Sequence, residues 1–232
     1  MAASIPTASD ALIAALKALN AANLPFVVLR NHEGLPHHWS NDVDILVEPV
    51  ALEEAHKTVL DAVQKNSANR PIDVMRRLNF RATRLSCADR VLQVDLYSLL
   101  SKAWVTYADT MRILEARQSA NSLFAVPEPT HEALLIAAKE LFSYREIRKR
   151  YHAQLAGFDA AKAEAAAESV FGPYVSSSGL SLLIEALKDP TVRGYPGLRL
   201  GRQMDVVSAV RWAALRRNGW IAQASIKGTV RS

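Results

Sequence analysis

Apolar residues recur along the start of the chain with two different periods. Leucine and isoleucine side chains at helical spacing follow Pro6 and predict a helix that Thr7 or Ser9 caps. Residues 26–29 are wholly apolar, which is typical of a strand covered on both faces rather than of a sheet edge. Residues 42–47 begin with alternating Asp and aliphatic residues and predict a second strand adjacent to the first.

The next segment predicts a helix followed by two more strands. Pro49 opens the helix, and a loop is expected around residues 66–71. Strands are predicted at residues 80–85 and 91–97, joined by a turn. Alternate residues of the second strand share a face, which gives two sets: Val91, Gln93, Asp95 and Tyr97 on one side, and Leu92, Val94 and Leu96 on the other.

The pattern becomes helical in the second half of the chain. Thr130 is expected to cap a long helix with an apolar stripe. Further helices are predicted at residues 159–171, 179–188 and 205–217. The chain therefore divides near Pro127 into an α/β domain, residues 1–127, and a helical domain, residues 128–232. The fold class is α+β, with a mixed β-sheet and flanking helices followed by an all-helical part.

Composition excludes several classes of protein. The chain has 232 residues, 50% of them hydrophobic, so it can bury a core without disulfide or metal staples. Cys87 is the only cysteine, so neither a disulfide nor a thiolate zinc site forms within the chain. No apolar run reaches the roughly 20 residues of a membrane span, and the N-terminus lacks the pattern of a secretory signal. We therefore expect a cytoplasmic protein.

Basic residues are concentrated at the C-terminal end. The formal net charge is +5, and residues 199–232 hold seven basic side chains against one acidic side chain. Such a tail could contact an anionic membrane surface or an acidic partner, or simply be solvated. Nucleic-acid binding is disfavoured, because the chain lacks an aromatic stacking platform with interleaved lysines.

Two aspartates stand at the start of the second predicted strand. Asp42 and Asp44 are two residues apart, so both side chains leave the same face, with α-carbons roughly 6.6 Å apart. Two carboxylates 4 Å apart repel by about 4 kcal/mol at an effective dielectric of 20, unless a proton or a cation relieves them. Mg²⁺ prefers such oxygen ligands, although a solvated pair at a strand end is the simpler interpretation. If the sheet places Asp95 beside them, three carboxylates could hold two ions of a phosphoryl-transfer site.

These residues resemble a known family. Residues 29–31, followed after ten residues by the acid pair, look like the signature of the DNA polymerase β-like nucleotidyltransferase superfamily, and Asp95 matches its third acid. The words Val28-Leu29-Arg30-Asn31 and Asn41-Asp42-Val43-Asp44 look like a bacterial subgroup of nucleotidyltransferase-fold proteins that is associated with cell-surface polysaccharide genes. The resemblance covers residues 24–98, and it is weaker in the helix at residues 131–134.

The resemblance implies a Mg²⁺-dependent transfer of a nucleoside monophosphate from a nucleoside triphosphate to an acceptor hydroxyl. Asp42 and Asp44 would bind the ion that carries the triphosphate. Asp95 would complete a second metal site and help to deprotonate the acceptor. Positioning and charge neutralisation supply nearly all the catalysis in such reactions.

The resemblance also implies nucleotide contacts around the acid pair. Arg30 and Asn31 replace the Gly-Ser turn of the family, so Arg30 could grip the phosphates while Asn31 stands in for the serine hydroxyl. Ser40 and Asn41, next to the acid pair, are the other expected nucleotide contacts. The same replacement could instead signal lost catalysis, which leaves a non-catalytic binding or regulatory module as the alternative function.

Other polar residues have simpler interpretations. Three histidines crowd the loop before the acid pair without the spacing of a zinc site, and they are expected to be exposed to solvent: His32, His37 and His38. His131 and His152 are expected on helix surfaces or as caps, and Cys87 is expected to be structural. The basic run at residues 145–150 suits the end of the long helix, and one of its arginines could contact a nucleotide or acceptor.

Overall fold

The computed structural model describes residues 5–39, 42–65, 71–102 and 105–198. Within them the chain forms nine strands, seven α-helices and two short 3-10 helices. In chain order the main elements are α1 Ala8–Ala21, β1 Phe26–Val28, β2 Val43–Val47, η1 Pro49–Ala51, α2 Leu52–Lys65, β3 Pro71–Arg77, β4 Phe80–Ser86, β5 Val91–Tyr97, β6 Leu100–Lys102, β7 Val105–Ala108, α3 Thr110–Glu115, β8 Gln118–Ser119, β9 Ala125–Val126, α4 Pro129–Tyr144, η2 Lys149–Tyr151, α5 His152–Leu155, α6 Ala160–Phe171 and α7 Ser177–Lys188.

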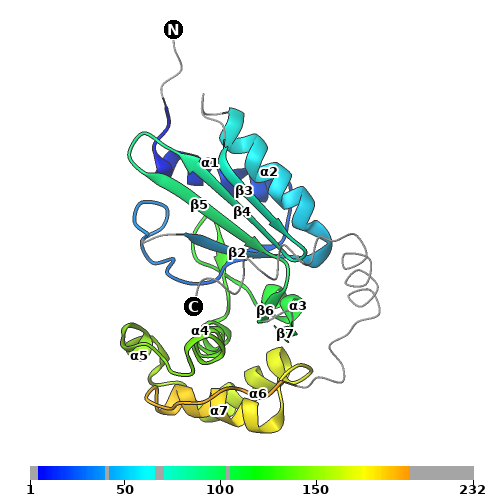
Figure 1. The fold of residues 1–232 in the computed structure, drawn as a ribbon, viewed down its shortest axis with the longest axis vertical. Helices are drawn as coiled ribbons and strands as arrows, with labels where there is room; N and C mark the ends of the chain where they lie inside the picture. Colours follow the sequence, from blue (N-terminus) through cyan, green and yellow to red (C-terminus); the bar gives the residue numbers. More distant parts are fainter. Residues whose placement is uncertain (1–4, 40–41, 66–70, 103–104, 199–232) are drawn as a thin grey trace.

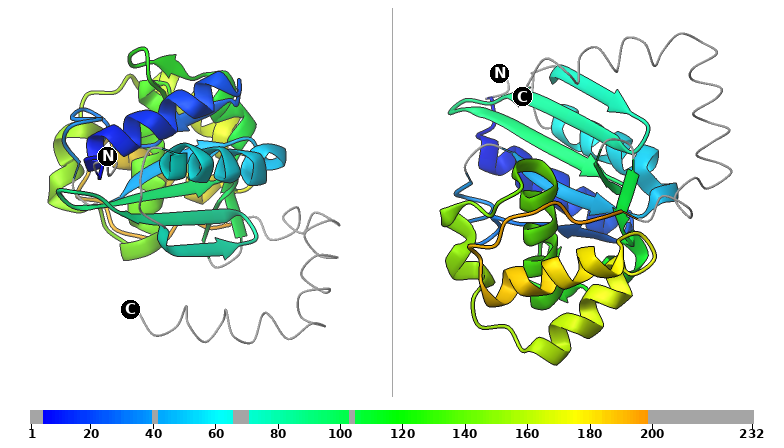
Figure 2. Two further views of the ribbon diagram at one scale, coloured as in Figure 1. Left: turned by 90° about the horizontal axis from the view of Figure 1, so that it is seen from above. Right: turned by 60° about the horizontal axis from the view of Figure 1, so that its bottom comes forward.

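A five-stranded mixed sheet organises the first half, in the order β1-β2-β5-β4-β3. Strands β2 and β5 are parallel, and the other neighbouring pairs are antiparallel. Helices α1 and α2 lie side by side over one face of this sheet (Figures 1 and 2). The mixed sheet with flanking helices confirms the predicted α/β character of this half.

Two apolar clusters cover the two faces of β1 and β2. One joins α1 and α2 to Val28, Ile45 and the inward residues of β5. The other joins Val27 and Leu46 to the helices α4, α6 and α7. Strand β1 is therefore buried on both faces, as predicted, but the prediction that it is not an edge was wrong, since it pairs only with β2 in the five-stranded sheet. The boundary at residue 127 stays a prediction.

Side-chain caps set the helix starts. Thr7 forms a capping box with Asp10 at the start of α1, as the sequence predicts. For α4 the prediction was wrong. The cap is Glu128, whose carboxylate accepts from the backbone N–H groups of Thr130 and His131, while Pro129 occupies the first helical position. Thr130 lies inside the helix.

Several elements of the structure were not predicted, namely β3, the small strands β6 to β9 and the short helix α3. The sequence pattern predicts a loop around residues 66–71 and no strand directly after it, but residues 71–77 form the outer strand of the sheet beside β4. The helix predicted at residues 205–217 and the basic tail lie outside the described residues. No helix within the described ranges has the length and apolar character to cross a bilayer.

Candidate active site

Parallel pairing of β2 with β5 brings the acids together. Asp44 and Asp95 are direct partners in the register, and Asp42 immediately precedes β2. One carboxylate oxygen of each residue lies within 4.8 Å of the other two. The expectation that the third acid lies beside the first two is confirmed. All three side chains leave the sheet face opposite α1 and α2, because their neighbours along β2 and β5 enter the cluster around those helices.

Burial disfavours the charged form of the carboxyl groups in this cluster. Asp44 and Asp95 are each 4% exposed. Burial raises the pKa of Asp95 to about 7, and the nearby Asp44 and Asp42 add to the rise, whereas hydrogen bonds from the Gln93 amide oppose it. Those bonds run from Gln93 Nε2 to both carboxylate oxygens of Asp95, at 3.1 and 3.2 Å. The sequence placed Gln93 on the same face but gave no sign that it would bind Asp95.

Arg30 lies against the acids. Its Nε donates to Oδ2 of Asp44 at 2.7 Å, and its Nη2 forms an ion pair with the same oxygen at 2.5 Å. Burial alone would lower the pKa of Arg30, but the carboxylate of Asp44 raises it. Burial raises the pKa of Asp44, an effect that Arg30 opposes. The other oxygen, Oδ1 of Asp44, is buried and accepts no hydrogen bond. Arg30, expected to grip phosphates, thus points its guanidinium at the metal-ligand candidates.

The turn that follows β1 keeps a conformation suited to glycine. Asn31 has a φ of 52°, in the left-handed region, which Asn tolerates better than most other residues do. The backbone N–H of Leu29 donates to the carbonyl of Asp44 at 2.9 Å, so the turn leaves the sheet beside the acids. Ser40 and Asn41 lie outside the described residues.

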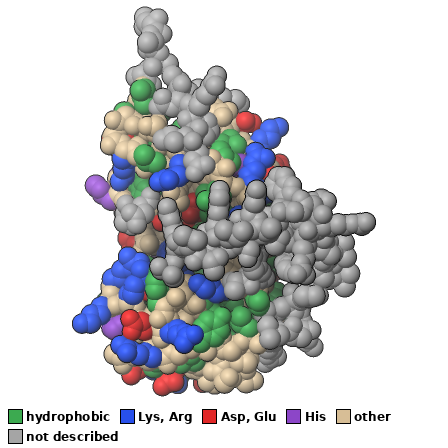
Figure 3. All heavy atoms as spheres, viewed as in Figure 1, with side chains coloured by type: hydrophobic (Ala, Val, Ile, Leu, Met, Phe, Trp, Pro, Cys, Tyr) green, Lys and Arg blue, Asp and Glu red, His purple; other side chains and the backbone are tan. Residues whose placement is uncertain are grey.

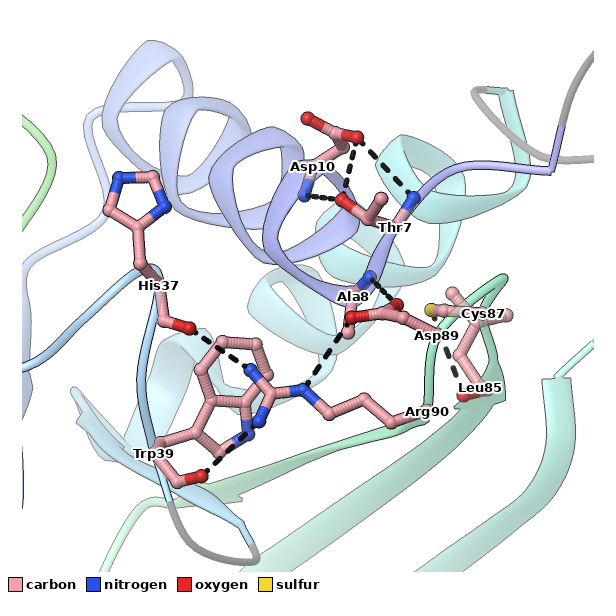
Figure 4. Close-up of polar contacts among 9 residues, drawn as sticks. All are labelled: Thr7, Ala8, Asp10, His37, Trp39, Leu85, Cys87, Asp89 and Arg90. Atoms are coloured by element: carbon pink, nitrogen blue, oxygen red, sulfur yellow. Dashed lines mark hydrogen bonds and ion pairs between the residues drawn. The ribbon is translucent and has the colours of Figure 1, made fainter.

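The loop that leads to Asp42 is tied to the β4–β5 turn (Figure 4). Arg90 stacks its guanidinium on the Trp39 ring, 3.6 Å from the centroid, and donates to the carbonyls of Trp39 and His37, each at 3.3 Å. The neighbouring Asp89 accepts from the backbone N–H of Ala8 at 2.8 Å. These contacts hold the approach to the acid pair against the sheet and α1.

Histidines and Cys87 lie apart from the acids. His32 was expected to be exposed, but its Nε2 lies 3.0 and 3.1 Å from the two carboxylate oxygens of Glu132, and both side chains are 17% exposed. His131 was expected on a helix surface and is buried instead. His152 is half-buried, with its Nε2 3.0 Å from the carbonyl of Ile147. Cys87 is half-buried, and burial raises its pKa, which suits a structural thiol.

Two tyrosines interact with the charges of the site. Burial raises the pKa of Tyr97 well above the usual value, and the charges of Asp44 and Asp95 add to the rise. Tyr151 is buried, its hydroxyl has no hydrogen-bond partner, and its charge interaction contributes to the raised pKa of Arg30. Sequence reasoning missed these residues, because an aromatic residue next to apolar positions predicts core rather than site.

The basic run of the helical half ends next to Tyr151 in the chain. Its predicted place at a helix end is right only for Arg145, the C-cap of α4. Arg148 donates from Nε and Nη2 to the buried Glu140, each at 2.6 Å. Arg150 is exposed and stacks over the Tyr151 ring, 4.6 Å from the centroid. Figure 3 shows Lys and Arg side chains gathered over this lower part of the molecule.

The acid cluster has the chemistry of a divalent-cation site. Three carboxylates are hard oxygen ligands, and their oxygens lie within 4.8 Å of one another, close enough for side-chain rotations to bring them onto one Mg²⁺ ion with Mg–O distances of about 2.1 Å. The unpartnered Oδ1 of Asp44 fits the same role, since a buried acceptor without a partner is destabilising unless something binds it. The residues therefore fit a divalent ion.

Comparison with known proteins adds little to these observations. No family model and no curated protein sequence matches the chain. A solved structure from H. pylori, provisionally named a nucleotidyltransferase, is similar at 12% sequence identity and a TM-score of 0.39, covering 77% of this chain and 79% of its own. The function is therefore inferred from the site itself.

Proposed function

We propose that the protein is a divalent-metal-dependent nucleotidyltransferase, which moves a nucleoside monophosphate from a nucleoside triphosphate to an acceptor hydroxyl. The observation that carries this proposal is that one carboxylate oxygen of each of Asp42, Asp44 and Asp95 lies within 4.8 Å of the other two, while Oδ1 of Asp44 is buried without a partner. The resemblance of the same residues to the acid signature of the DNA polymerase β-like superfamily supports it.

Asp42, Asp44 and Asp95 would hold the ion, which we propose to be Mg²⁺. When bound, the ion neutralises the negative charge of the triphosphate and aligns its phosphates. Asp95 would also help to deprotonate the acceptor hydroxyl, the role that the resemblance implies for the third acid. Asp42 and Asp44 act by position and charge.

Nucleotide contacts are proposed from both sides of the acids. Arg30 and Asn31 are proposed to contact the phosphates, with the left-handed backbone of Asn31 supplying a turn that can approach them closely. Ser40 and Asn41, which precede Asp42 in the sequence, are the other proposed contacts. Arg150 is an exposed cation that lies over the Tyr151 ring and is a further candidate for a phosphate contact. The cellular setting that the resemblance implies is nucleotide-sugar or surface-polysaccharide metabolism in the cytoplasm.

Metal and nucleotide titration tests this proposal. Each nucleoside triphosphate is titrated into the protein with and without Mg²⁺, and heat and pyrophosphate release are measured. Binding that requires Mg²⁺ is expected for the wild type and should be lost in Asp42→Asn, which keeps the shape of the side chain. Asp61→Asn removes an exposed carboxylate from α2 and is the matched control. Equal Mg²⁺-dependent binding in Asp42→Asn and in the wild type would contradict the metal site.

The second candidate is a non-catalytic module that keeps the fold for binding or regulation. The specific observation in its favour is the Arg30–Asp44 ion pair, because the guanidinium already neutralises one of the expected metal ligands. Pyrophosphate release with any acceptor hydroxyl would rule out this alternative. Triphosphate binding without release, across a panel of sugar and alcohol acceptors, would favour it.

A further inference from the structure

A cation is built into the acid cluster. Arg30 donates from Nε to Oδ2 of Asp44, its Nη2 forms an ion pair with the same oxygen, and the two side chains are only 12% and 5% exposed. Arginine keeps its proton at any ordinary pH, so this cation is permanent. The contact joins the end of β1 to β2 across a short span, and it does not depend on the loop residues between them.

The Arg30–Asp44 ion pair reduces the number of carboxylate oxygens that are available to bind metal ions. Two metal ions about 3.5–4 Å apart need a carboxylate that gives one oxygen to each. Oδ2 of Asp44 is already bound by Arg30, which leaves Oδ1. Both oxygens of Asp95 face the amide nitrogen of Gln93, at 3.1 and 3.2 Å. On the two strand acids, Oδ1 of Asp44 is thus the oxygen without a contact, and together with the carboxylate of Asp42 it suits one ion, with its other positions left to water and phosphate oxygens.

The balance of charges in the site also favours one metal ion rather than two. When all are ionised, three carboxylates and one guanidinium leave an excess of two negative charges, which one divalent ion neutralises. A second ion at Oδ2 of Asp44 would lie next to the guanidinium of Arg30, and repulsion between like charges is strong where water is excluded.

We propose that Arg30 takes the place of one of the two metal ions, so that the loaded site holds a single divalent ion coordinated through Oδ1 of Asp44. This inference rests on the proposed function, since it concerns how that site is loaded. Arg30 acts here as a positioning residue, because it holds Asp44 in one orientation and blocks its second oxygen.

Electron paramagnetic resonance of bound Mn²⁺ tests how many metal ions each chain binds, without any measurement of turnover. Mn²⁺ is added alone, and then together with each of four non-hydrolysable nucleoside triphosphates. The wild type is expected to bind one Mn²⁺ per chain, with the spectrum of an isolated ion. Arg30→Ala frees Oδ2 of Asp44 and is expected to bind two, with the line broadening of a spin-coupled pair.

Two further variants control for charge and folding. Arg30→Lys keeps the positive charge and is expected to keep the single ion, whereas Arg112→Gln removes an exposed arginine from α3 and should leave the spectrum unchanged. A coupled pair in the wild type, or a single ion in folded Arg30→Ala, overturns the inference but leaves the proposed function standing. No bound Mn²⁺ in the wild type overturns both. If Arg30→Ala does not fold, the wild-type count decides alone.

Discussion

Asp95 is predicted to destabilise the protein at neutral pH. Its carboxyl group is 4% exposed, and its pKa is raised from 3.8 to about 7, first by burial and then by the charges of Asp44 and Asp42. A carboxyl group whose pKa is raised in the folded state binds its proton more tightly there than in the unfolded chain. The free energy of unfolding therefore falls as the pH rises from about 4 to about 7, and the loss is complete above pH 7.

The shift sets the size of this effect. About three pKa units correspond to about 4 kcal/mol, at about 1.4 kcal/mol per unit. Asp95→Asn removes the ionisation but keeps the size of the side chain and an acceptor for Gln93. The variant is therefore expected to gain stability relative to the wild type as the pH rises, by up to about 4 kcal/mol between pH 4 and pH 8.

Urea unfolding followed by circular dichroism, at one-unit steps of pH and with chelator present to remove divalent ions, measures the difference. Asp61→Asn, an exposed aspartate on α2, is the matched control and should follow the wild type at every pH. If the stability of Asp95→Asn runs parallel to that of the wild type from pH 4 to pH 8, the carboxyl group is not held at a raised pKa, and the reasoning is refuted.

Mutations at three contacts outside the acid cluster are predicted to change stability by less than the change at Asp95. Arg90→Met removes the stacking on Trp39 and should cost about 1 kcal/mol and shift the tryptophan emission to longer wavelength; unchanged emission would contradict the contact. The hydrogen bond to Glu132 raises the pKa of His32, so the stability that their pair adds is complete below pH 6.5 and is lost as the pH rises through the raised pKa. His32→Gln should accordingly flatten the melting temperature between pH 6 and pH 8, and equal slopes would refute this role. Thr7→Ala removes the α1 cap and should cost about 1 kcal/mol in urea unfolding, whereas no loss would show that the cap is dispensable.

The sequence predicts which side chains of the candidate site share a face of the sheet. It does not predict the register, that is, which residues of β2 and β5 lie opposite each other. Strict alternation along residues 91–97 fixes which side chains share a face, and the Asp-x-Asp spacing does the same at the start of β2. Nothing local sets which residue of β2 lies opposite Asp95, because the two strands are joined by a helix and two further strands. That pairing depends on how the whole sheet packs.

Elements without a clear hydrophobic period escaped prediction. Strand β3 begins with Pro71 and mixes charged with apolar residues, as an outer strand with a solvated edge does, so it lacks the signature of a core strand. The start of α4 was misassigned, because Thr130 is a common cap while Glu128 is an unusual one. Pro129 at the first helical position was the better signal.

The Arg30–Asp44 pair bears on both candidate functions, and the stability prediction helps to separate them. In an enzyme, the guanidinium opposes the protonation of Asp44 and orients its carboxylate before the ion binds, and the ion then relieves Asp95. In a module that never binds an ion, Asp95 would remain a buried acid that lowers the stability of the fold at neutral pH, and no metal binding would compensate for this loss. Residues that lower stability where nothing in the packing requires them are expected at functional sites. A gain in stability for Asp95→Asn, together with a rise in wild-type stability on adding Mg²⁺ that Asp95→Asn lacks, would therefore favour the metal-dependent function.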